Sequence, residues 1–320
     1  MSVYPRFLHF AWWNLHNFAH FDAAKSSLAR WPNSVQDYEA KRDRILAALH
    51  EVFGKKRPHL LAFCEITKEA ARDLANRLPG DYRVALPPIP GKDEFQVAVF
   101  YRSGLGFTPE LPIIPSDQED IREGTRPMLP IHLAFAGHLI RFVACHWTAF
   151  DYSSSRIARE RLADVLKRDS YQFLRPPVPT PGLARHLVIL GDLNEEPTAP
   201  VFRERLIGCR DRESSRIRHR DDEGTQRVRL YDAAWRYLGE KIPHGLAGWP
   251  VGAAGTLYND STDKDTKGWK TFDHLLVSAG LLGMTPPYLD EAKTGIVSTP
   301  SMRDRAVGPL RPWTGCWGVP

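Results

Sequence analysis

The sequence has few cysteines and no pattern that would link them. Its 320 residues include four, at scattered positions and without a CxxC pair. This excludes the small secreted domains that depend on a dense set of disulfides. Cys64 and Cys145 lie within the apolar runs LLAFC and RFVAC, where a free thiol acts as a small hydrophobic side chain. We therefore expect a reducing compartment and a cytoplasmic protein.

Long apolar runs and targeting signals are also lacking. No stretch approaches the roughly 20 apolar residues that a membrane-spanning helix needs. The first residues, MSVYPRFLHFAWW, contain no basic region ahead of a long apolar run and no small-residue cleavage site. We therefore expect neither a membrane span nor a signal peptide.

The composition is that of a globular protein with a moderate positive charge. Hydrophobic residues make up 42% and charged residues 25%, which is enough apolar material for a sizeable core. We expect a single domain over residues 1–320, with a polar, Arg-rich insertion at about 208–229. The formal net charge of +5 mildly favours anionic partners, and nucleic acid, most simply DNA, is the expected one.

The stretch HLVILGDLNEEP, residues 186–197, is the centre of the pattern. Residues 187–190 are too continuously apolar for a half-exposed strand and too few for a helix, so they predict a strand buried on both faces. Gly191 permits a sharp turn. Asp192 and Asn194 are two residues apart, so they project to the same side at the strand end. A carboxylate beside an amide at a rigid strand end suits a metal-bound water or a phosphate.

Other predicted strands share this habit of ending in a polar side chain. Strands are predicted at 7–13, 59–64, 95–101, 129–135, 138–145 and 271–277, and helices at 35–53, 67–78, 153–166, 198–206 and 230–238. A hairpin is predicted between 256–258 and 269–278. The polar residues at or near strand ends are Asn14, Glu65, His146 and Asp273. Two mixed sheets packed face to face, with helices outside, would bring these ends to one rim.

Five motifs occur in the order found in one known superfamily. They are WNLHNF at 13–18, AFCEIT at 62–67, ACHWTAF at 144–150, GDLNEEP at 191–197 and FDHLLVS at 272–278. With them the chain resembles the endonuclease/exonuclease/phosphatase superfamily, which includes apurinic endonucleases, deoxyribonucleases, neutral sphingomyelinases and inositol polyphosphate phosphatases. The resemblance covers nearly the whole chain and implies an α/β fold, a four-layer α-β-β-α sandwich of two mixed sheets.

The resemblance also implies roles for the strand-end residues. Glu65 would be the direct carboxylate ligand of a divalent metal, Mg²⁺ or Mn²⁺, with Asn14 and Asp192 at the same site. Asp192 would position or deprotonate the attacking water, and Asn194 would hold a phosphate oxygen. The remaining two implied catalytic residues are His146, a strand-end histidine, and Asp273, which orients a catalytic histidine in the family.

This set of side chains suits phosphate-ester hydrolysis on physical grounds as well. Mg²⁺ takes few protein ligands and keeps several waters, while a neutral amide and a histidine contact phosphate without adding repulsion. We expect a metal-dependent phosphodiesterase, most simply a DNA endonuclease. The alternatives are a phosphatase or phospholipid phosphodiesterase on the same fold and a catalytically impaired binding module.

One family motif is missing. The family closes with Ser-Asp-His, which nothing after Asp273 supplies. His274 follows directly, but neighbours on a strand point to opposite faces, so this dipeptide does not fill both roles. We expect either a truncated chain, which we favour, or a divergent member with reduced turnover.

Simpler explanations remain for several residues. Asp192 and Asn194 could simply form a turn at the end of a strand. Glu65 could be the acid that begins a helix, and the His146 ring could only donate to a backbone carbonyl. Trp147 is the best candidate for stacking on a base, although core packing is the commoner role of such a tryptophan. The Arg-rich insertion is interleaved with acids, so a salt-bridged surface loop is at least as consistent as a track for phosphates. The pair His16 and His20 lacks a third zinc ligand, and Asp260, Asp263 and Asp265 fit a solvated turn.

Overall fold

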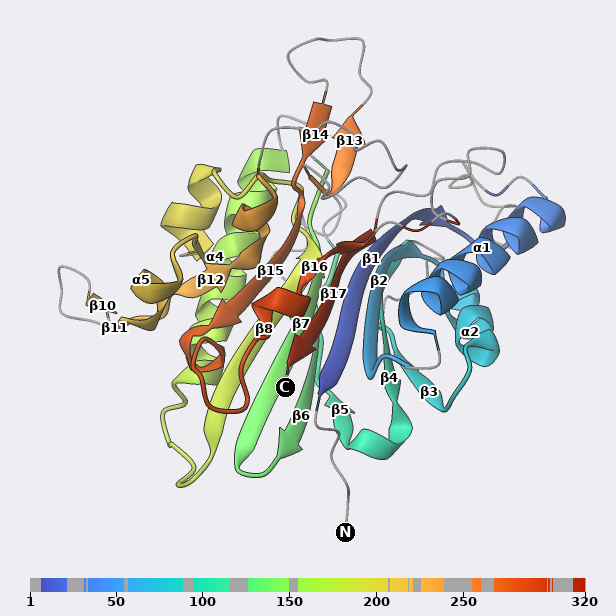
Figure 1. Cartoon of the computed structure of the whole chain (residues 1–320). Helices are drawn as coiled ribbons and strands as arrows, with labels where there is room; N and C mark the ends of the chain where they lie inside the picture. The colour runs from blue at the N-terminus through green and yellow to red at the C-terminus, as the bar shows by residue number, and fades with distance from the viewer. Residues whose placement is uncertain are drawn as a thin grey trace.

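The computed structural model consists mainly of two β-sheets packed face to face, with helices on the outer face of each (Figure 1). It describes residues 7–21, 32, 34–54, 57–88, 95–114, 126–149, 155–206, 208–217, 219–220, 226–238, 255–259, 268–297, 299, 301 and 313–319. Within this part of the chain, no helix is both long and apolar enough to cross a membrane.

The first sheet has six strands in the order β16-β17-β1-β2-β4-β3. β1 runs parallel to β2 and antiparallel to β17, while β4 is antiparallel to both β2 and β3, so the sheet is mixed. The bounds are β1 (Leu8–Phe18), β2 (Leu60–Ile66), β3 (Tyr82–Ala85), β4 (Gln96–Arg102), β16 (Gly295–Val297) and β17 (Trp313–Val319).

The second sheet has seven strands in the order β5-β6-β7-β8-β15-β12-β9. β7 and β8 are parallel, and β15 returns antiparallel to β8. The bounds are β5 (Phe107–Pro109), β6 (Leu129–Phe135), β7 (His138–His146), β8 (Ala184–Asp192), β9 (Gly208–Cys209), β12 (Leu230–Asp232) and β15 (Asp273–Ser278). Two further pairs form small hairpins, β10 (His219–Arg220) with β11 (Gln226–Arg227) and β13 (Leu257–Asn259) with β14 (Gly268–Lys270).

Helices begin and end where the local sequence favours it. α1 (Val35–Phe53) starts where the Ser34 hydroxyl accepts the Asp37 amide, and it ends at Gly54, whose φ is +54°. α2 (Lys68–Arg77) is capped in the same way by Thr67. The remaining helical elements are η2 (Ser103–Leu105), α4 (Ser155–Leu174), π-helical η3 (Val201–Leu206), α5 (Arg212–Arg216), η4 (Ala233–Tyr237), η5 (Ala279–Leu281) and η6 (Glu291–Lys293).

Three apolar clusters fill the spaces between neighbouring layers. One lies between the sheets and contains Phe10 of β1 and Phe142 of β7, whose ring centroids are 5.1 Å apart. A second joins the first sheet to α1 and α2, and a third joins the second sheet to α4 and η3. The order helix, sheet, sheet, helix confirms the predicted α-β-β-α sandwich.

Most predicted elements are present, and the differences have local causes. The helix predicted at 35–53 is α1 with the same bounds, whereas α4 continues eight residues beyond the predicted end at 166. Residues 230–232, predicted as helix, instead form β12, because they pair with β15 inside the second sheet. The predicted hairpin is β13–β14, but 273–278 belong to the second sheet. The Arg-rich segment contains short elements, of which β9 joins a sheet edge. Asp260, Asp263 and Asp265 lie outside the described residues.

Candidate active site

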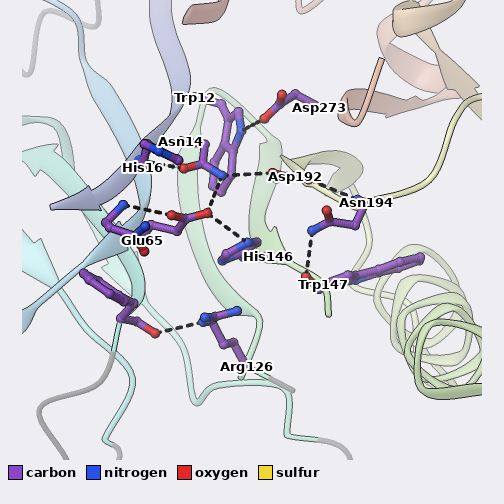
Figure 2. A network of polar contacts seen from close by, with 12 residues as sticks. Trp12, Asn14, His16, Glu65, Arg126, His146, Trp147, Asp192, Asn194 and Asp273 are labelled. Atoms are coloured by element: carbon purple, nitrogen blue, oxygen red, sulfur yellow. Dashed lines mark hydrogen bonds and ion pairs between the residues drawn. The ribbon is translucent and has the colours of Figure 1, made fainter. Parts of the chain in front are cut away.

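The strand ends bring the predicted polar residues of the second sheet into adjacent positions. In the pairing of β7 with β8, His146 is the partner of Asp192. In the pairing of β15 with β8, Asp192 is the partner of Asp273. Asn14 of β1 and Glu65 of β2 occupy the corresponding ends in the first sheet, and the side chains converge between the sheets (Figure 2).

A single amide group joins the two principal carboxylates. Asn14 Nδ2 donates to Glu65 Oε1 and to Asp192 Oδ2, both at 2.9 Å. The two carboxylate oxygens are therefore separated by no more than the sum of these distances. Asn14 Oδ1 accepts the His16 amide at 2.8 Å, which fixes the orientation of the side chain. Residues far apart in the sequence thus share one hydrogen-bonded centre across the two sheets.

The backbone at this centre is strained. Four of the five non-glycine residues with positive φ in the described chain lie here: His16, Asn17, Glu65 and Asn194, with φ between 50° and 58°. The pairing of β1 with β2 shifts register between Asn14 and Phe18, and the pairing of β2 with β4 shifts between Phe63 and Ile66. Bulges of this kind redirect side chains. A non-glycine residue held at positive φ costs about 1–3 kcal/mol, and such residues are found most often at functional sites, where the surrounding contacts maintain them.

The Glu65 carboxylate is held by backbone and side-chain donors. Asn17 N donates to its Oε2 at 2.8 Å, and His146 Nε2 lies 3.8 Å from its Oε1. Thr67 caps α2 and Glu69 supplies the acid of its first turn, so Glu65 does not serve to initiate that helix. The position of Glu65 therefore favours a role in the candidate site over that of an acid that begins α2.

Asp192 and Asn194 form a compact turn at the end of β8. Asp192 Oδ1 accepts the Asn194 amide at 3.0 Å, and Asn194 Nδ2 donates to the Trp147 carbonyl at 2.9 Å. Asn194 Nδ2 carries a second amide hydrogen, for which no acceptor is found among the described residues. Trp147 itself has no exposed surface and packs with its ring parallel to that of Phe202. In this structure it presents no free ring face to a base, because it is part of the core.

Asp273 faces the space between the sheets. Its Oδ1 accepts the Trp12 indole N–H at 2.7 Å. The next residue, His274, points to the other face, where Nδ1 lies 2.8 Å from Asp232 Oδ2 and Nε2 lies 2.8 Å from the Glu195 carbonyl oxygen. Burial lowers the pKa of His274, but the Asp232 carboxylate and the Glu195 carbonyl more than offset this, so the pKa lies above its usual range and the charged ring is favoured. His274 therefore anchors the site loop and does not partner Asp273.

Three basic residues support the site, and the sequence pattern did not single them out. Arg126, drawn below Glu65 and His146 in Figure 2, donates to the Phe95 carbonyl at 2.8 Å. Arg159 of α4, 2% exposed, donates to Glu195 Oε1 at 2.7 Å and to the carbonyls of Thr148 and Ala149. It thereby joins the loops that follow β7 and β8. An isolated arginine or lysine on a helix gives no motif, so only the tertiary structure reveals these roles.

The third basic residue is Lys41 of α1, which is 2% exposed. Its Nζ donates to the His16 carbonyl at 2.5 Å, so it supports the bulge of β1 behind the site. Burial lowers the pKa of Lys41 to about 7, and the negative charge of Glu65 opposes that shift.

The electric field at the site is dominated by carboxylates. The buried thiol of Cys64 has a pKa well above its usual range, first because of burial and then because of the charges of Glu65, Asp192 and Asp273. Arg126 acts in the opposite direction. Three carboxylates around one buried atom form a negative environment that favours a cation.

Two of the carboxylates, Glu65 and Asp192, could share one hard divalent cation. Among the described residues no group of three or more His, Cys, Asp and Glu side chains is placed to hold a metal. Glu65 would supply a carboxylate oxygen, with Asp192 near it and water in the other positions, as Mg²⁺ prefers. Asn14 presents its nitrogen to both carboxylates and engages its oxygen with His16, so it would act as a donor unless its amide rotates.

Comparisons with known proteins bear on the fold and the family. No curated protein matches the chain. Among solved structures, an endonuclease/exonuclease/phosphatase family protein from Bacteroides thetaiotaomicron is 18% identical, with a TM-score of 0.54 over 99% of this chain and 95% of that one. A mannosyl-6-phosphatase from the same species is 18% identical, with a TM-score of 0.52 over 98% and 97%. D. rerio TDP2 complexed with a single-strand DNA product is 15% identical, with a TM-score of 0.54 over 99% and 100%.

Structural likeness at such low identity shows the fold. The match to a family model reaches further, because it spans residues 11–283 and includes every strand end described above. The chain belongs to the endonuclease/exonuclease/phosphatase family.

Proposed function

We propose that this chain is a Mg²⁺- or Mn²⁺-dependent phosphodiesterase that hydrolyses DNA. The observation that carries the proposal is the Asn14 amide, which holds the carboxylates of Glu65 and Asp192 together at the strand ends. The family consists of hydrolytic phosphoesterases, and the net charge of +5 favours a polyanionic substrate. The similar TDP2 structure contains single-strand DNA, which supports the choice of substrate.

Each side chain then has a definite task. Asp192, held by Asn14 and the Asn194 amide, accepts a proton from the attacking water as the new O–P bond forms and the bond to the leaving oxygen breaks. The leaving oxygen takes a proton from solvent. A bound divalent ion would supply charge neutralisation at the phosphate and leaving oxygens.

The phosphate itself needs donors rather than further acids. The His146 ring and the remaining amide hydrogen of Asn194 supply them from the ends of β7 and β8. Arg126 adds positive charge at the site, where its effect on the pKa of Cys64 opposes that of the three carboxylates. Asp273 holds the Trp12 indole and so fixes the two sheets relative to each other at the site.

The test is cleavage of supercoiled plasmid and of single-strand oligonucleotides in Mg²⁺ and in Mn²⁺. We expect nicking by the parent chain and a loss of about 10²- to 10⁴-fold in Asp192→Asn, which keeps the shape but not the base. Asp211→Asn is the matched control, because it makes the same chemical change at the exposed cap of α5. DNA left intact in both metals would refute the proposal.

A phosphatase is the second candidate, because the mannosyl-6-phosphatase shares the fold over nearly the whole chain. Release of phosphate from mannose 6-phosphate or inositol phosphates, without nicking of DNA, would select it. A catalytically impaired binding module predicts that neither substrate is consumed and that Asp192→Asn leaves binding unchanged.

A further inference from the structure

A second polar site lies at the opposite end of the strands that carry the catalytic residues. A cavity of about 230 Å³ is lined by Arg185 near the start of β8, by Ser278 at the end of β15, and by residues of the Arg-rich segment. Arg185 and Asp192 are seven residues apart on β8, which corresponds to about 23 Å at the usual rise of a strand. The cavity is therefore separate from the candidate active site.

Four arginines line this cavity: Arg175, Arg185, Arg216 and Arg229. No aspartate or glutamate is among its described lining residues. Arg216 is paired with Glu213, which neutralises it. The other three form no ion pair with any part of the chain that the structure describes.

The environment of Arg185 shows that its charge is held in place. Its guanidinium lies over the Phe173 ring, 5.4 Å from the centroid, and donates to the Phe173 carbonyl. Like charges gathered around a cavity repel one another, and this cost is offset when an anion shares them. Within the described residues, the three arginines thus form a positive site that no carboxylate neutralises.

The remaining lining residues and the volume of the cavity limit the kinds of ligand that it could bind. Ser215 and Ser278 also line the cavity, beside apolar side chains such as Leu174 and Val228. The Ser215 hydroxyl donates to the Asp211 carbonyl, and the Ser278 hydroxyl accepts the Leu187 amide. The planar donor fork of arginine matches phosphate oxygens in pairs, which a lysine does not do. The volume is below the 300–1,000 Å³ typical of drug-sized ligands, so it suits a compact anion.

We propose that this cavity binds a phosphate group, carried as a monoester on a small molecule or at the end of a nucleic-acid strand. Arg216 and Arg229 come from the Arg-rich insertion, for which the sequence left open a phosphate-binding or a salt-bridged role. The insertion does both: Arg216 pairs with an acid, while Arg229 joins Arg175 and Arg185 around the cavity.

The test is calorimetric titration of the full chain with inorganic phosphate, in EDTA and at constant ionic strength. Arg175→Gln/Arg229→Gln removes two unpaired charges from the cavity, and we expect phosphate binding to weaken about 10- to 100-fold, as for the loss of charged hydrogen bonds. Arg168→Gln/Arg203→Gln is the matched control, since both side chains are exposed on α4 and η3 outside the cavity. It should bind phosphate like the parent.

Two further variants separate this site from the catalytic one. Ile217→Glu places a carboxylate at the rim on a residue that is 60% exposed, so the fold is retained, and it should weaken phosphate binding as well. His146→Ala removes a phosphate donor of the candidate active site, so the phosphate binding that persists in this variant belongs to the cavity, and Arg175→Gln/Arg229→Gln should weaken it there as well. Equal phosphate affinity in the parent, the double variant and Ile217→Glu would overturn the proposal, whatever the chain does to DNA.

Competition experiments would identify the molecule that carries the phosphate group. Displacement of inorganic phosphate by ribose 5-phosphate, but not by a 5′-phosphorylated oligonucleotide, assigns the cavity to a small ester. The reverse result assigns it to a strand end. Both support a phosphate site, because an oligonucleotide without the 5′-phosphate serves as the negative control.

Discussion

The two ends of β8 carry opposite charges. At its carboxyl end, Asp192 lies with Glu65 and Asp273 in a field that favours a cation. At its beginning, Arg185 lies with Arg175 and Arg229 around a cavity whose described lining contains no acidic residue. The net charge of +5 conceals this division, because it averages over both ends. The comparison teaches that the charge of the chain says less about its ligands than the distribution of that charge along one strand.

The backbone differs between the ends as well. At the catalytic end, positive φ occurs at residues that carry polar side chains, such as Glu65 and Asn194. At the other end it occurs in Ala136-Gly137, the two-residue turn that joins β6 to β7, where a hairpin requires it. Strain at the first end is thus compensated by the hydrogen bonds of the site, whereas at the second it follows from the turn alone.

The largest expected effect is at the catalytic end. Glu65→Gln removes the carboxylate that would hold the divalent ion, and we expect cleavage to fall about 10²- to 10⁴-fold, since a metal contributes several kcal/mol to the transition state. Mg²⁺ should raise the unfolding temperature of the parent but not of this variant. Arg175→Gln/Arg229→Gln should keep the Mg²⁺ response. A Mg²⁺-dependent shift that survives in Glu65→Gln would place the ion elsewhere.

The sequence predicted which residues gather at the carboxyl end of β8 far better than those at its beginning. Continuous apolar runs identify buried strands such as β8, and a polar residue directly after such a run marks the strand end. Convergence of Asn14, Glu65 and Asp192 follows once two sheets pack face to face. The register that pairs Asp192 with both His146 and Asp273 did not follow, because side-chain period alone does not fix which strands are neighbours.

The sequence also did not predict the roles of residues that act through tertiary contacts, because it does not show which elements are neighbours. Arg159 occupies an ordinary helical position, and only the loops it contacts give it a role. Trp147 follows His146 directly, so adjacency suggested a substrate contact, whereas packing against Phe202 buries it. The alternation of acids with arginines in 208–229 likewise gave no sign that two of those arginines meet Arg185.

Substitution of two glycines, one near each end of β8, would show how rigid the structure is at each end. A Cβ at Gly191 would overlap the backbone carbonyl of Cys145 in the neighbouring strand, which is held in the middle of the sheet. We expect Gly191→Ala to lower the free energy of unfolding by about 3 kcal/mol. At Gly280 the Cβ would meet the His186 ring at 2.7 Å, and a side chain can shift. Gly280→Ala should therefore cost only about 1 kcal/mol.

Denaturant unfolding of the two variants measures this difference. Gly104→Ala serves as the control, because nothing lies within 4 Å of the added Cβ and its effect should stay within about 0.5 kcal/mol. If Gly280→Ala proved as damaging as Gly191→Ala, the two ends would be equally rigid and the comparison would fail.

The smallest expected effect concerns the anchor of the site loop. His274 has a pKa above its usual 6.5, because Asp232 and the Glu195 carbonyl favour its charged form against burial. A raised folded-state pKa means that the stabilisation is complete below about pH 6.5 and is lost as the pH rises through the folded value. His274→Asn should lack this loss, which we expect to be of the order of 1 kcal/mol, the worth of one such hydrogen bond. Asp232→Asn keeps the acceptor that caps η4 but removes the charge, so it should shift the loss to lower pH. Unfolding in urea from pH 5.5 to 9 compares the three chains, and parallel pH profiles for the parent and His274→Asn would show that the ring carries no extra proton in the folded state.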